Sequence, residues 1–404
     1  MKLFKKEGLE FYIIVLLISV FLFDFITKVH VIYDLKGFIR YSAIPKLVIE
    51  LLLVCFLLKN FFKAKVNIYY LILISVSVFF GTLFVEHDLD FDFIYRKGYT
   101  LNKYLFSFIL ASVILSINIE NQKKTINTIE KTILIIGILN SIFIIIGLMT
   151  NTELFRSYPH SLRFGFNGFF VKTSETSYLY ILLIISTYYY YKKTSKGSFL
   201  CLYFILISLL IGTKVIWFFL FFLVMIHFLL NSRRVVRIFF KISFVLVSII
   251  VIFKGELITN FIVNSFSFGP KLFKEHGLIT VLTSKRDLLF ISTYDYVIEN
   301  WTIINYLLGG IDNKKYGVEF ELIDIFAFFG IIGSVLFSIL INRVYRFHLF
   351  DRLKLILFIY FFMVVFSAGN FFTSIICSSF AFIVFFKMND YNEYKNYQTI
   401  NKAG

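Results

Sequence analysis

The stretch SFLCLYFILISLLIGTKVIWFFLFFLVMIHFLL, residues 198–230, is apolar over almost its whole length. As one helix it would run roughly 50 Å, whereas the hydrocarbon core of a bilayer is only about 30 Å thick. A turn at Gly212-Thr213-Lys214 would divide it into two short helices that each suffice to cross the core when little tilted. Whether the chain turns back here fixes the direction of every later helix.

The distribution of positive charge favours the turn. With the turn, the basic linkers 231–241 and 342–354 and the C-terminal tail fall on the cytoplasmic side, and together they hold eleven lysines and arginines. Without it, these linkers lie outside and the segment 254–323 moves to the cytoplasm with only seven. Because short basic loops stay in the cytoplasm, we predict two helices, 198–212 and 214–230, with both termini cytoplasmic.

The rest of the chain has the same apolar character. Of its 404 residues 59% are hydrophobic, and the mean hydropathy is +0.82, which is more apolar surface than a soluble domain of this length can hide. We predict an all-α polytopic protein of about twelve transmembrane helices, one integral membrane domain over 1–404 with external loops at 151–173 and 254–323. The other predicted helices are 9–27, 44–62, 66–85, 103–119, 132–150, 174–191, 237–253, 324–341, 353–370 and 372–387.

The net charge of +16 indicates contact with lipid rather than with nucleic acid. The lysines and arginines lie in short clusters along the chain, which suits positive-inside anchoring and anionic headgroups, whereas nucleic-acid binding needs a concentrated basic face. Cys55, Cys201 and Cys377 lie in apolar runs and are predicted to be reduced, buried packing residues. The six histidines form no metal-binding pattern, so we expect neither a metal nor another cofactor.

The shorter external loop combines cations with glycine. Arg163 precedes Gly165, and Lys172 follows at the mouth of a helix. A guanidinium binds phosphate bidentately, and a glycine allows the backbone to come close to a ligand. Both cations are therefore candidate phosphate ligands, with snorkelling to lipid headgroups as the alternative for Arg163. Ser174 is predicted to cap the helix, with Glu175 in its first turn.

The longer external loop contains a predicted amphipathic helix, 283–301. Ile291, Tyr294 and Ile298 fall at helical spacing, and Arg286 stands near the helix start. Helix N-termini attract anions, and flanking cations strengthen that attraction. Arg286 is thus a further candidate phosphate ligand, with headgroup anchoring as the alternative.

Three acids crowd the start of the apolar stretch GVEFELIDIFAFFGIIG, residues 317–333. Asp324 enters the apolar run, Glu321 precedes it by three residues on the same helical face, and Glu319 precedes both. Ionisable residues at the edge of hydrocarbon are costly and are functional candidates by default. We predict a role in proton transfer, the alternative being an acidic first turn that stabilises the helix dipole.

Together these signals place cations and carboxylates on one face of the membrane, and Lys214 at the predicted turn points to the same face. Cations stabilise a departing diphosphate, and a carboxylate takes the proton of an attacking hydroxyl. The combination suits a substrate that carries a diphosphate on a lipid.

Four pieces follow one another along residues 160–340. They are Arg163 with Gly165 and Glu175-Thr176-Ser177, LLIGTKVIWFFLFF, TSKRDLLF with YLLGGID, and VEFELIDIFAFFGIIG. In this order they resemble the O-antigen polymerase (Wzy) family, which is related to the O-antigen ligases. The family's arginine–glycine stretch leads to Glu-Pro-Ser, and Thr176 stands here in the place of the proline.

The resemblance implies a GT-C-like fold and a metal-independent, inverting glycosyltransferase in the bacterial cytoplasmic (inner) membrane. Its substrate would be an undecaprenyl-diphosphate-linked oligosaccharide, whose growing glycan leaves its lipid carrier for the non-reducing end of a new lipid-linked unit on the outer face. The product would be O-antigen or a similar surface polysaccharide. The sugar, the linkage, the oligomeric state and the binding of a chain-length regulator stay open.

The resemblance also assigns roles to the charged residues. Glu319 or Glu321 would be the general base, with Asp324 orienting the acceptor. His276 is the second candidate for the base, because an imidazole titrates near neutral pH. The cations that would hold the diphosphate are Arg163 and Arg286, assisted by Lys172 or Lys214.

Two other functions remain as alternatives. A flippase or other transporter of lipid-linked oligosaccharides would share the size, helix count and basic charge, but transporters more often show two related halves and polar sites near the midplane. Here the polar residues gather at external boundaries, and one external loop has 70 residues, 254–323, which favours an enzyme. An O-antigen ligase acting on a lipid A-core acceptor is barely separable from a polymerase by sequence.

Overall fold

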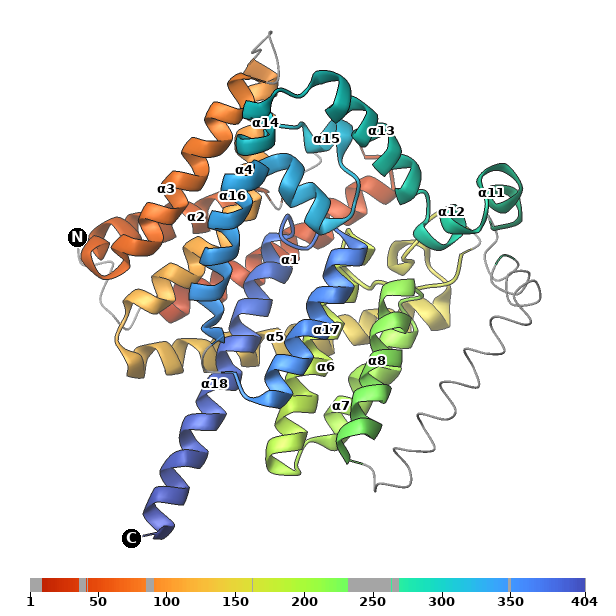
Figure 1. Ribbon diagram of the computed structural model, residues 1–404. Helices are drawn as coiled ribbons and strands as arrows, with labels where there is room; N and C mark the ends of the chain where they lie inside the picture. Colours follow the sequence, from red (N-terminus) through yellow and green to blue (C-terminus); the bar gives the residue numbers. More distant parts are fainter. Residues whose placement is uncertain are drawn as a thin grey trace.

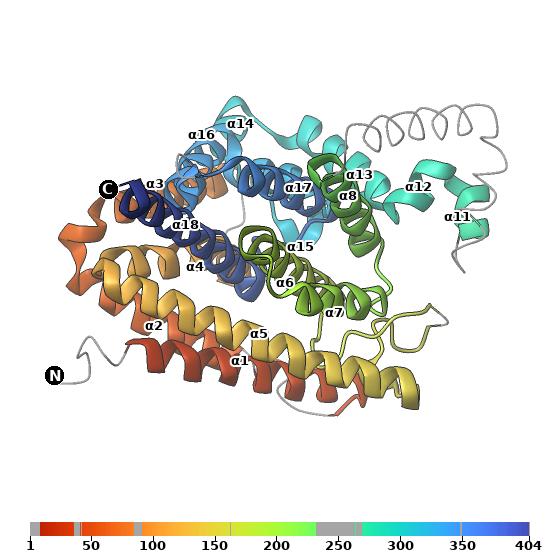
Figure 2. The same ribbon diagram turned by 90° about the horizontal axis from the view of Figure 1, so that it is seen from below.

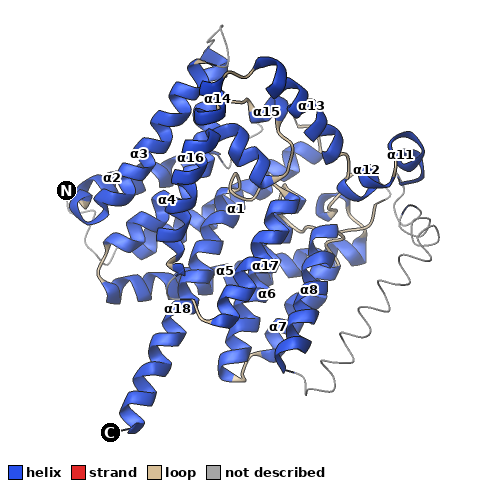
Figure 3. Cartoon of the chain, in the orientation of Figure 1, coloured by secondary structure: helices blue, strands red, loops and turns tan. Residues whose placement is uncertain are grey.

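The protein is almost entirely helical. Within the described residues no strand forms, and the extended backbone includes a single isolated antiparallel bridge, between Arg156 and Phe166 (Figure 3). The predicted all-α class is therefore confirmed. The computed structural model describes residues 9–35, 41, 43–84, 91–161, 163–231, 263, 269–347 and 350–403.

The helices up to residue 231 coincide with the predicted ones, and α4 and α5 begin well before their apolar cores because polar turns continue the helix. The predicted helix 237–253 lies outside the described residues. In chain order the helices of this part are α1 (Leu9–Ile32), α2 (Ala43–Lys59), α3 (Phe61–Leu83), α4 (Phe91–Ser116), α5 (Ile119–Thr150), the 3-10 turn Glu153–Phe155, α6 (Thr173–Thr194), α7 (Ser198–Leu209) and α8 (Lys214–Asn231).

The second part of the chain places short helices before three long ones. The predicted amphipathic helix is present as α13, and its apolar residues Ile291, Tyr294 and Ile298 are exposed. The helices are α11 (Gly269–His276), α12 (Leu278–Thr283), α13 (Arg286–Asn300), α14 (Ile303–Leu308), α15 (Asn313–Tyr316), α16 (Glu321–Tyr345), α17 (Arg352–Ala368) and α18 (Ile375–Ala403).

The turn within 198–230 is confirmed. Helix α7 ends at Leu209 and α8 begins at Lys214, so the apolar stretch is two short helices rather than one long one. Gly212 makes the reversal in left-handed backbone, with φ of +72°. This turn brings Lys214 to the same end of the molecule as the loop between α5 and α6, as described below.

The distribution of apolar side chains is typical of a membrane protein. Among the described residues, α3, α4 from Asp92, α5 and α16 are long and apolar enough to cross a membrane. Large apolar side chains such as Phe79 on α3 and Ile135 on α5 are more than half exposed, although α6 is buried on all sides from Tyr178 to Ile185. An apolar outer surface around an apolar core suits lipid as the solvent. Cys201 and Cys377 are buried as predicted, but Cys55 is exposed on α2, so its predicted burial is wrong.

Helix α6 lies at the centre of the bundle, packed against α7 and the first half of α18. Helices α1 and α5 run side by side along one edge (Figure 2). Helices α13, α14 and α15 gather at one end, and the C-terminal part of α18 projects from the opposite end (Figure 1). The two ends of the bundle therefore carry different sets of connections.

Helix α16 is broken at Gly330, where φ is +66° and ψ is −171°. The segment after α14 fits against this break: the N–H of Gly310 donates to the Phe328 carbonyl at 3.1 Å. A Cβ atom on Gly330 would lie only 2.3 Å from the nitrogen of Gly309. Gly309 and Gly330 thus allow a loop segment to pack against the side of an apolar helix. Such irregular backbone is tolerated within a membrane only where protein satisfies its hydrogen bonds.

Two cations of α4 hold the same segment from its other side. The buried ammonium of Lys97 donates to the carbonyl groups of Gly310 and Ile311, and Arg96 forms an ion pair with Asp312 at 3.3 Å. The residues between α14 and α15 are therefore fixed between α4 and α16.

At the opposite end of the bundle, a separate polar network around Asp351 joins neighbouring helices. Lys193 Nζ lies 2.5 Å from Asp351 Oδ2, and the hydroxyl of Tyr189 donates to the same oxygen at 2.9 Å. The other carboxylate oxygen accepts from the Lys354 N–H at 2.7 Å and caps α17. This network ties the end of α6 to the start of α17.

Candidate functional site

Three of the four predicted phosphate ligands come together at the α13 end of the bundle. Lys214 lies within electrostatic range of both Arg163 and Arg286. Tyr158 lies within electrostatic range of both arginines, with the Arg163 guanidinium 3.8 Å from the centre of its ring. Burial raises the pKa of the Tyr158 hydroxyl, and the two guanidinium charges offset part of that rise. We call Arg163, Lys214 and Arg286 the cation cluster.

The loop that carries Arg163 is bound to the α7–α8 turn. The Ser157 hydroxyl donates to the Ile211 carbonyl at 2.9 Å, and a Cβ atom on Gly165 would lie 2.3 Å from that carbonyl oxygen. A Cβ atom on Gly212 would in turn lie 2.3 Å from the Phe164 carbonyl oxygen. Gly165 therefore allows the α7–α8 turn to pack closely against its backbone, whereas we predicted that a ligand would do so. The pair of glycines places Arg163 beside Lys214.

Lys214 positions the cation cluster through hydrogen bonds to the segment that precedes α13. Its ammonium donates to the carbonyls of Val281 and Leu282 at 2.8 and 3.3 Å, and to the Ser284 hydroxyl at 3.0 Å. It thereby stabilises the C-terminus of α12, where unpaired carbonyls attract cations. Ser284 and Lys285 follow in left-handed backbone, and α13 begins at Arg286. Lys214 thus fixes the turn that presents Arg286.

Glu319 is the acid that meets the cation cluster. Its carboxylate lies 3.4 Å from Arg286 Nε, and half of its side chain is exposed. Arg286 also donates to the Ser367 carbonyl at 3.1 Å. One guanidinium therefore joins the segment before α16 to the end of α17, and it does so beside an accessible carboxylate.

Glu321 and Asp324 are buried and hold backbone. The two oxygens of Glu321 accept from the N–H groups of Phe371 and Phe372 at 2.9 and 2.8 Å, and its side chain is 1% exposed. Asp324 accepts from the Val318 N–H at 2.7 Å. These two acids hold the loops around Glu319 in place. Of the three acids, Glu319 is the one with a direct ion pair to the cation cluster among the described residues.

Lys172 belongs to a different feature, a polar cavity of about 330 Å³. Lys172 is the N-cap residue of α6 without a side-chain cap hydrogen bond, so the predicted capping role of Ser174 is wrong. Glu175 opens into the cavity and accepts from the Ser374 hydroxyl at 3.1 Å. The charged and hydroxyl-bearing side chains that line this cavity are Asp24, Thr27, Lys46, Tyr99, Lys103, Lys172, Glu175 and Thr373.

Sequence reasoning missed the cavity, because its charges come from four helices. Lys46 Nζ lies 3.3 Å from Asp24 Oδ1, and the buried second oxygen, Oδ2, has no hydrogen-bond partner among the described residues. The signal was present in the sequence: Asp24 and Lys46 each stand as an isolated charge in an apolar run. What the sequence does not reveal is that they face Glu175.

The cavity and the cation cluster are neighbours. The loop Gly369–Ser374 bonds to Glu321 through Phe371 and Phe372 and to Glu175 through Ser374. On α6, Tyr178 lies one turn after Glu175, donates to the Gly369 carbonyl at 2.5 Å and is within electrostatic range of Arg286. One helical turn spans about 5 Å, so Glu175 at the cavity and Tyr178 near Arg286 lie close together on α6.

His276, the second candidate base, lies at the end of α11 with its ring nitrogen 3.9 Å from Glu275. No group of three or more histidine, cysteine or acidic side chains that could hold a metal ion occurs among the described residues. No family model matches the chain, and comparison with curated proteins and with solved structures finds no match.

Proposed function

We propose that the protein is a membrane glycosyltransferase of the GT-C type, with about twelve spans, that polymerises oligosaccharides linked to a lipid diphosphate. The observation that carries the proposal is the convergence of Arg163, Lys214 and Arg286 beside the half-exposed carboxylate of Glu319. Cations that stabilise a leaving diphosphate and a carboxylate that takes a proton are the two requirements of this transfer. The resemblance to O-antigen polymerases supports the same reaction.

These groups supply what the proposed reaction needs. The hydroxyl oxygen of the acceptor sugar attacks the anomeric carbon of the donor glycan, and the bond from that carbon to the diphosphate oxygen breaks. The departing diphosphate keeps the electron pair, and the guanidinium groups of Arg163 and Arg286 bind its oxygens. Glu319 receives the hydroxyl proton. Lys214 holds the turn that presents Arg286.

The polar cavity is the proposed site for the acceptor sugar. Its volume of 330 Å³ lies at the lower end of the range of small-molecule sites. Its carboxylates, ammonium groups and tyrosine match the many hydroxyl groups of a sugar ring, and Glu175 stands one turn of α6 from Tyr178. Lys172 would then contact the sugar rather than the diphosphate.

The proposed orientation places the cation cluster on the outer face of the cytoplasmic membrane. The end around Asp351 contains Lys193 and Lys354, from linkers that the positive-inside rule assigns to the cytoplasm. The cation cluster lies at the other end, where α17 finishes beside Arg286. Undecaprenyl-diphosphate-linked units would thus be joined outside the cytoplasm.

A glycan ladder from a deletion strain tests the proposal. Complementation with the wild-type chain should restore a ladder of many repeat units, and the Arg163→Ala and Arg286→Ala chains should leave single-unit glycans at unchanged membrane levels. The Lys274→Ala chain, which removes an exposed cation on α11, should restore the full ladder. Bare core with lipid-linked polymer in the deletion strain would instead identify a ligase, and lipid-linked units retained on the cytoplasmic side would identify a flippase.

A further inference from the structure

A basic pocket lies at the end of the bundle opposite to the cation cluster. It measures about 450 Å³ and lies between the start of α3 and the end of α16, beside Leu115 of α4. Its cations are Lys63, Arg343 and Arg346, and none of the eight described residues that line it is acidic. The described lining of the pocket therefore concentrates three positive charges.

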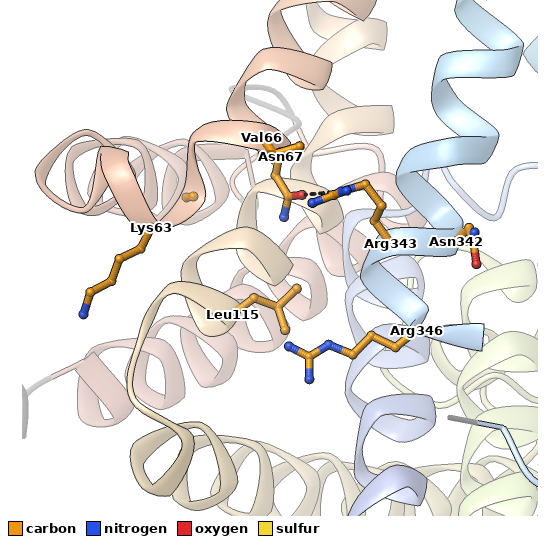
Figure 4. A pocket seen from close by; sticks show the side chains of 8 residues that line it. Lys63, Val66, Asn67, Leu115, Asn342, Arg343 and Arg346 are labelled. Atoms are coloured by element: carbon orange, nitrogen blue, oxygen red, sulfur yellow. Dashed lines mark hydrogen bonds between the residues drawn. The ribbon is translucent and has the colours of Figure 1, made fainter. Parts of the chain in front are cut away.

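Both arginines are held in place by neighbouring helices. Arg343 Nε donates to Asn67 Oδ1 at 3.3 Å, and Asn67 donates to the Ser112 hydroxyl at 3.1 Å. Arg346 ends α16 in left-handed backbone, and its guanidinium lies 5.2 Å from the centre of the Phe386 ring. Figure 4 shows both side chains extending from α16 toward α3 and Leu115. Such pre-oriented guanidinium groups lose little entropy when they bind an anion.

The pocket lies where the apolar outer surface ends. Phe62 and Tyr69 on α3 are 87% and 53% exposed, and Val335 and Ile339 on α16 are 54% and 37% exposed. Arg343 follows Ile339 by four residues, which is about 6 Å along the helix. Cations at such a boundary suit contact with lipid headgroups, with exposed apolar surface for acyl chains beside them.

We propose that this pocket binds the phosphate group of an anionic glycerophospholipid, with the acyl chains against the apolar surface of α3 and α16. Arg343 and Arg346 bind the phosphate oxygens, and Lys63 adds a third positive charge. A soluble phosphate shares the headgroup chemistry but not the contact with the apolar surface. The inference does not depend on the proposed glycosyltransferase function, because it rests on another end of the molecule.

Binding of fluorescent phosphatidylglycerol to the purified full-length chain in detergent tests the proposal. The double variant Arg343→Gln/Arg346→Gln should bind about tenfold or more weakly than the wild type, since it removes both charge-assisted contacts to the phosphate. The control Lys65→Gln/Arg352→Gln removes two exposed cations from the same end and should bind within about twofold of wild type. An equal loss of affinity in both double variants, or no loss of affinity in either, would overturn the proposal that this pocket binds the lipid.

Two further arms separate the phosphate source and guard against misfolding. Asn67→Ala keeps every charge but removes the hydrogen bond that orients Arg343, so it should weaken binding by about threefold. Wild-type affinity in this variant would contradict the claim that an oriented Arg343 guanidinium binds the phosphate. Phosphatidylcholine should not compete, and inorganic phosphate at millimolar concentration should not displace the lipid. Full displacement by inorganic phosphate would assign the pocket to a soluble anion, and equal competition by phosphatidylcholine would exclude recognition of anionic lipid.

Discussion

Glu319 and Arg286 form an ion pair of 3.4 Å across 33 positions of the sequence, and Glu319 does so from left-handed backbone with φ of +61°. Such a conformation costs a non-glycine residue of the order of 1 kcal/mol. Gly369 leaves room for it, because a Cβ atom there would lie 2.3 Å from the Glu319 carbonyl oxygen. The pair is thus specified by residues from three segments.

Replacing Glu319 by Gln should shorten the glycan ladder severely while the protein stays at its normal level in the membrane. The amide still accepts a hydrogen bond from Arg286 but takes no proton, which removes roughly a hundredfold or more of rate from general-base catalysis. Ladder length and immunoblot measure the two effects. Glu299→Gln, an exposed acid at the end of α13, serves as the control; a full ladder from both variants would clear Glu319 of the chemistry.

Replacing Glu321 by Gln should act on stability. The carboxylate accepts two backbone N–H groups, from Phe371 and Phe372, whereas an amide has one acceptor oxygen and would leave one N–H unpaired. Such a buried loss costs about 1–3 kcal/mol, so the midpoint of thermal unfolding in detergent should fall by several degrees. An unchanged midpoint would contradict the role of Glu321 in holding the Gly369–Ser374 loop.

Gly165→Ala should destabilise the protein and shorten the ladder. A Cβ atom there would lie 2.3 Å from the Ile211 carbonyl oxygen, at a backbone φ of +145° that disfavours other residues. We expect a loss of about 1–3 kcal/mol in the free energy of unfolding. Gly98→Ala is the matched control, because a Cβ atom there meets nothing within 4 Å; in a helix interior it should gain about 0.5–1 kcal/mol. The prediction fails if both variants unfold alike.

Lys214→Met should loosen the turn between α12 and α13. Methionine keeps the apolar length but loses the donor to Val281, Leu282 and Ser284. Hydrogen exchange of the amides over 281–290 should therefore accelerate by at least about tenfold, which corresponds to 1.4 kcal/mol, and the ladder should shorten because Arg286 is displaced. Lys274→Met on α11 should change neither. Unaltered exchange in the Lys214 variant would exclude the positioning role.

Asp351 should make stability depend on pH. Burial alone would raise the pKa of its carboxyl, but hydrogen bonds from Lys193, the Lys354 N–H and Tyr189 outweigh burial and hold the pKa below its ordinary value of 3.8. The ionised form therefore stabilises the fold above about pH 4, and this contribution disappears as pH falls through the folded pKa. Asn also caps helices, so Asp351→Asn should cost about 0.5–1 kcal/mol near pH 7.

Thermal unfolding of the wild type and Asp351→Asn at several pH values measures that effect. The difference between the two midpoints should be largest at neutral pH and should shrink as the pH falls below about 4 and the folded carboxyl takes up its proton. The Asp295→Asn chain, altered at an exposed position on α13, provides the control. A difference that is constant over the whole range would contradict the prediction.

The sequence predicts the helices well because apolar length and loop charge are local properties. The turn at Gly212 follows from the distance that one helix of 198–230 would span and from where the lysines and arginines fall. The prediction that Arg163 lies near Arg286 follows only from the assignment of both loops to the same side of the membrane. The contact partners of these residues could not be predicted. Gly165 packs against Ile211, and Glu321 accepts from Phe371, because loops distant in sequence come together, and the hydrophobic periodicity carries no information on how loops pack.

The polar cavity shows the same limit. Asp24 and Lys46 could be recognised as isolated charges in apolar runs, but their pairing depends on how α1 crosses α2. The exposure of Cys55 likewise depends on which face of α2 packs inward. Hydropathy distinguishes membrane from water, and it does not distinguish lipid from protein as the neighbour of an apolar side chain.

The break at Gly330 has a consequence for how such a chain can diverge. Helix α14 and the carboxyl-bearing first half of α16 lie in one stretch of sequence, from Ile303 to Gly330, and the segment after α14 bonds back to α16 through Gly310 and Ile311. An exchange of genetic material with its crossover at Gly330 would therefore keep the acids with the loop that fits against the break, but would separate Glu321 from Phe371 and Phe372, whose N–H groups it accepts.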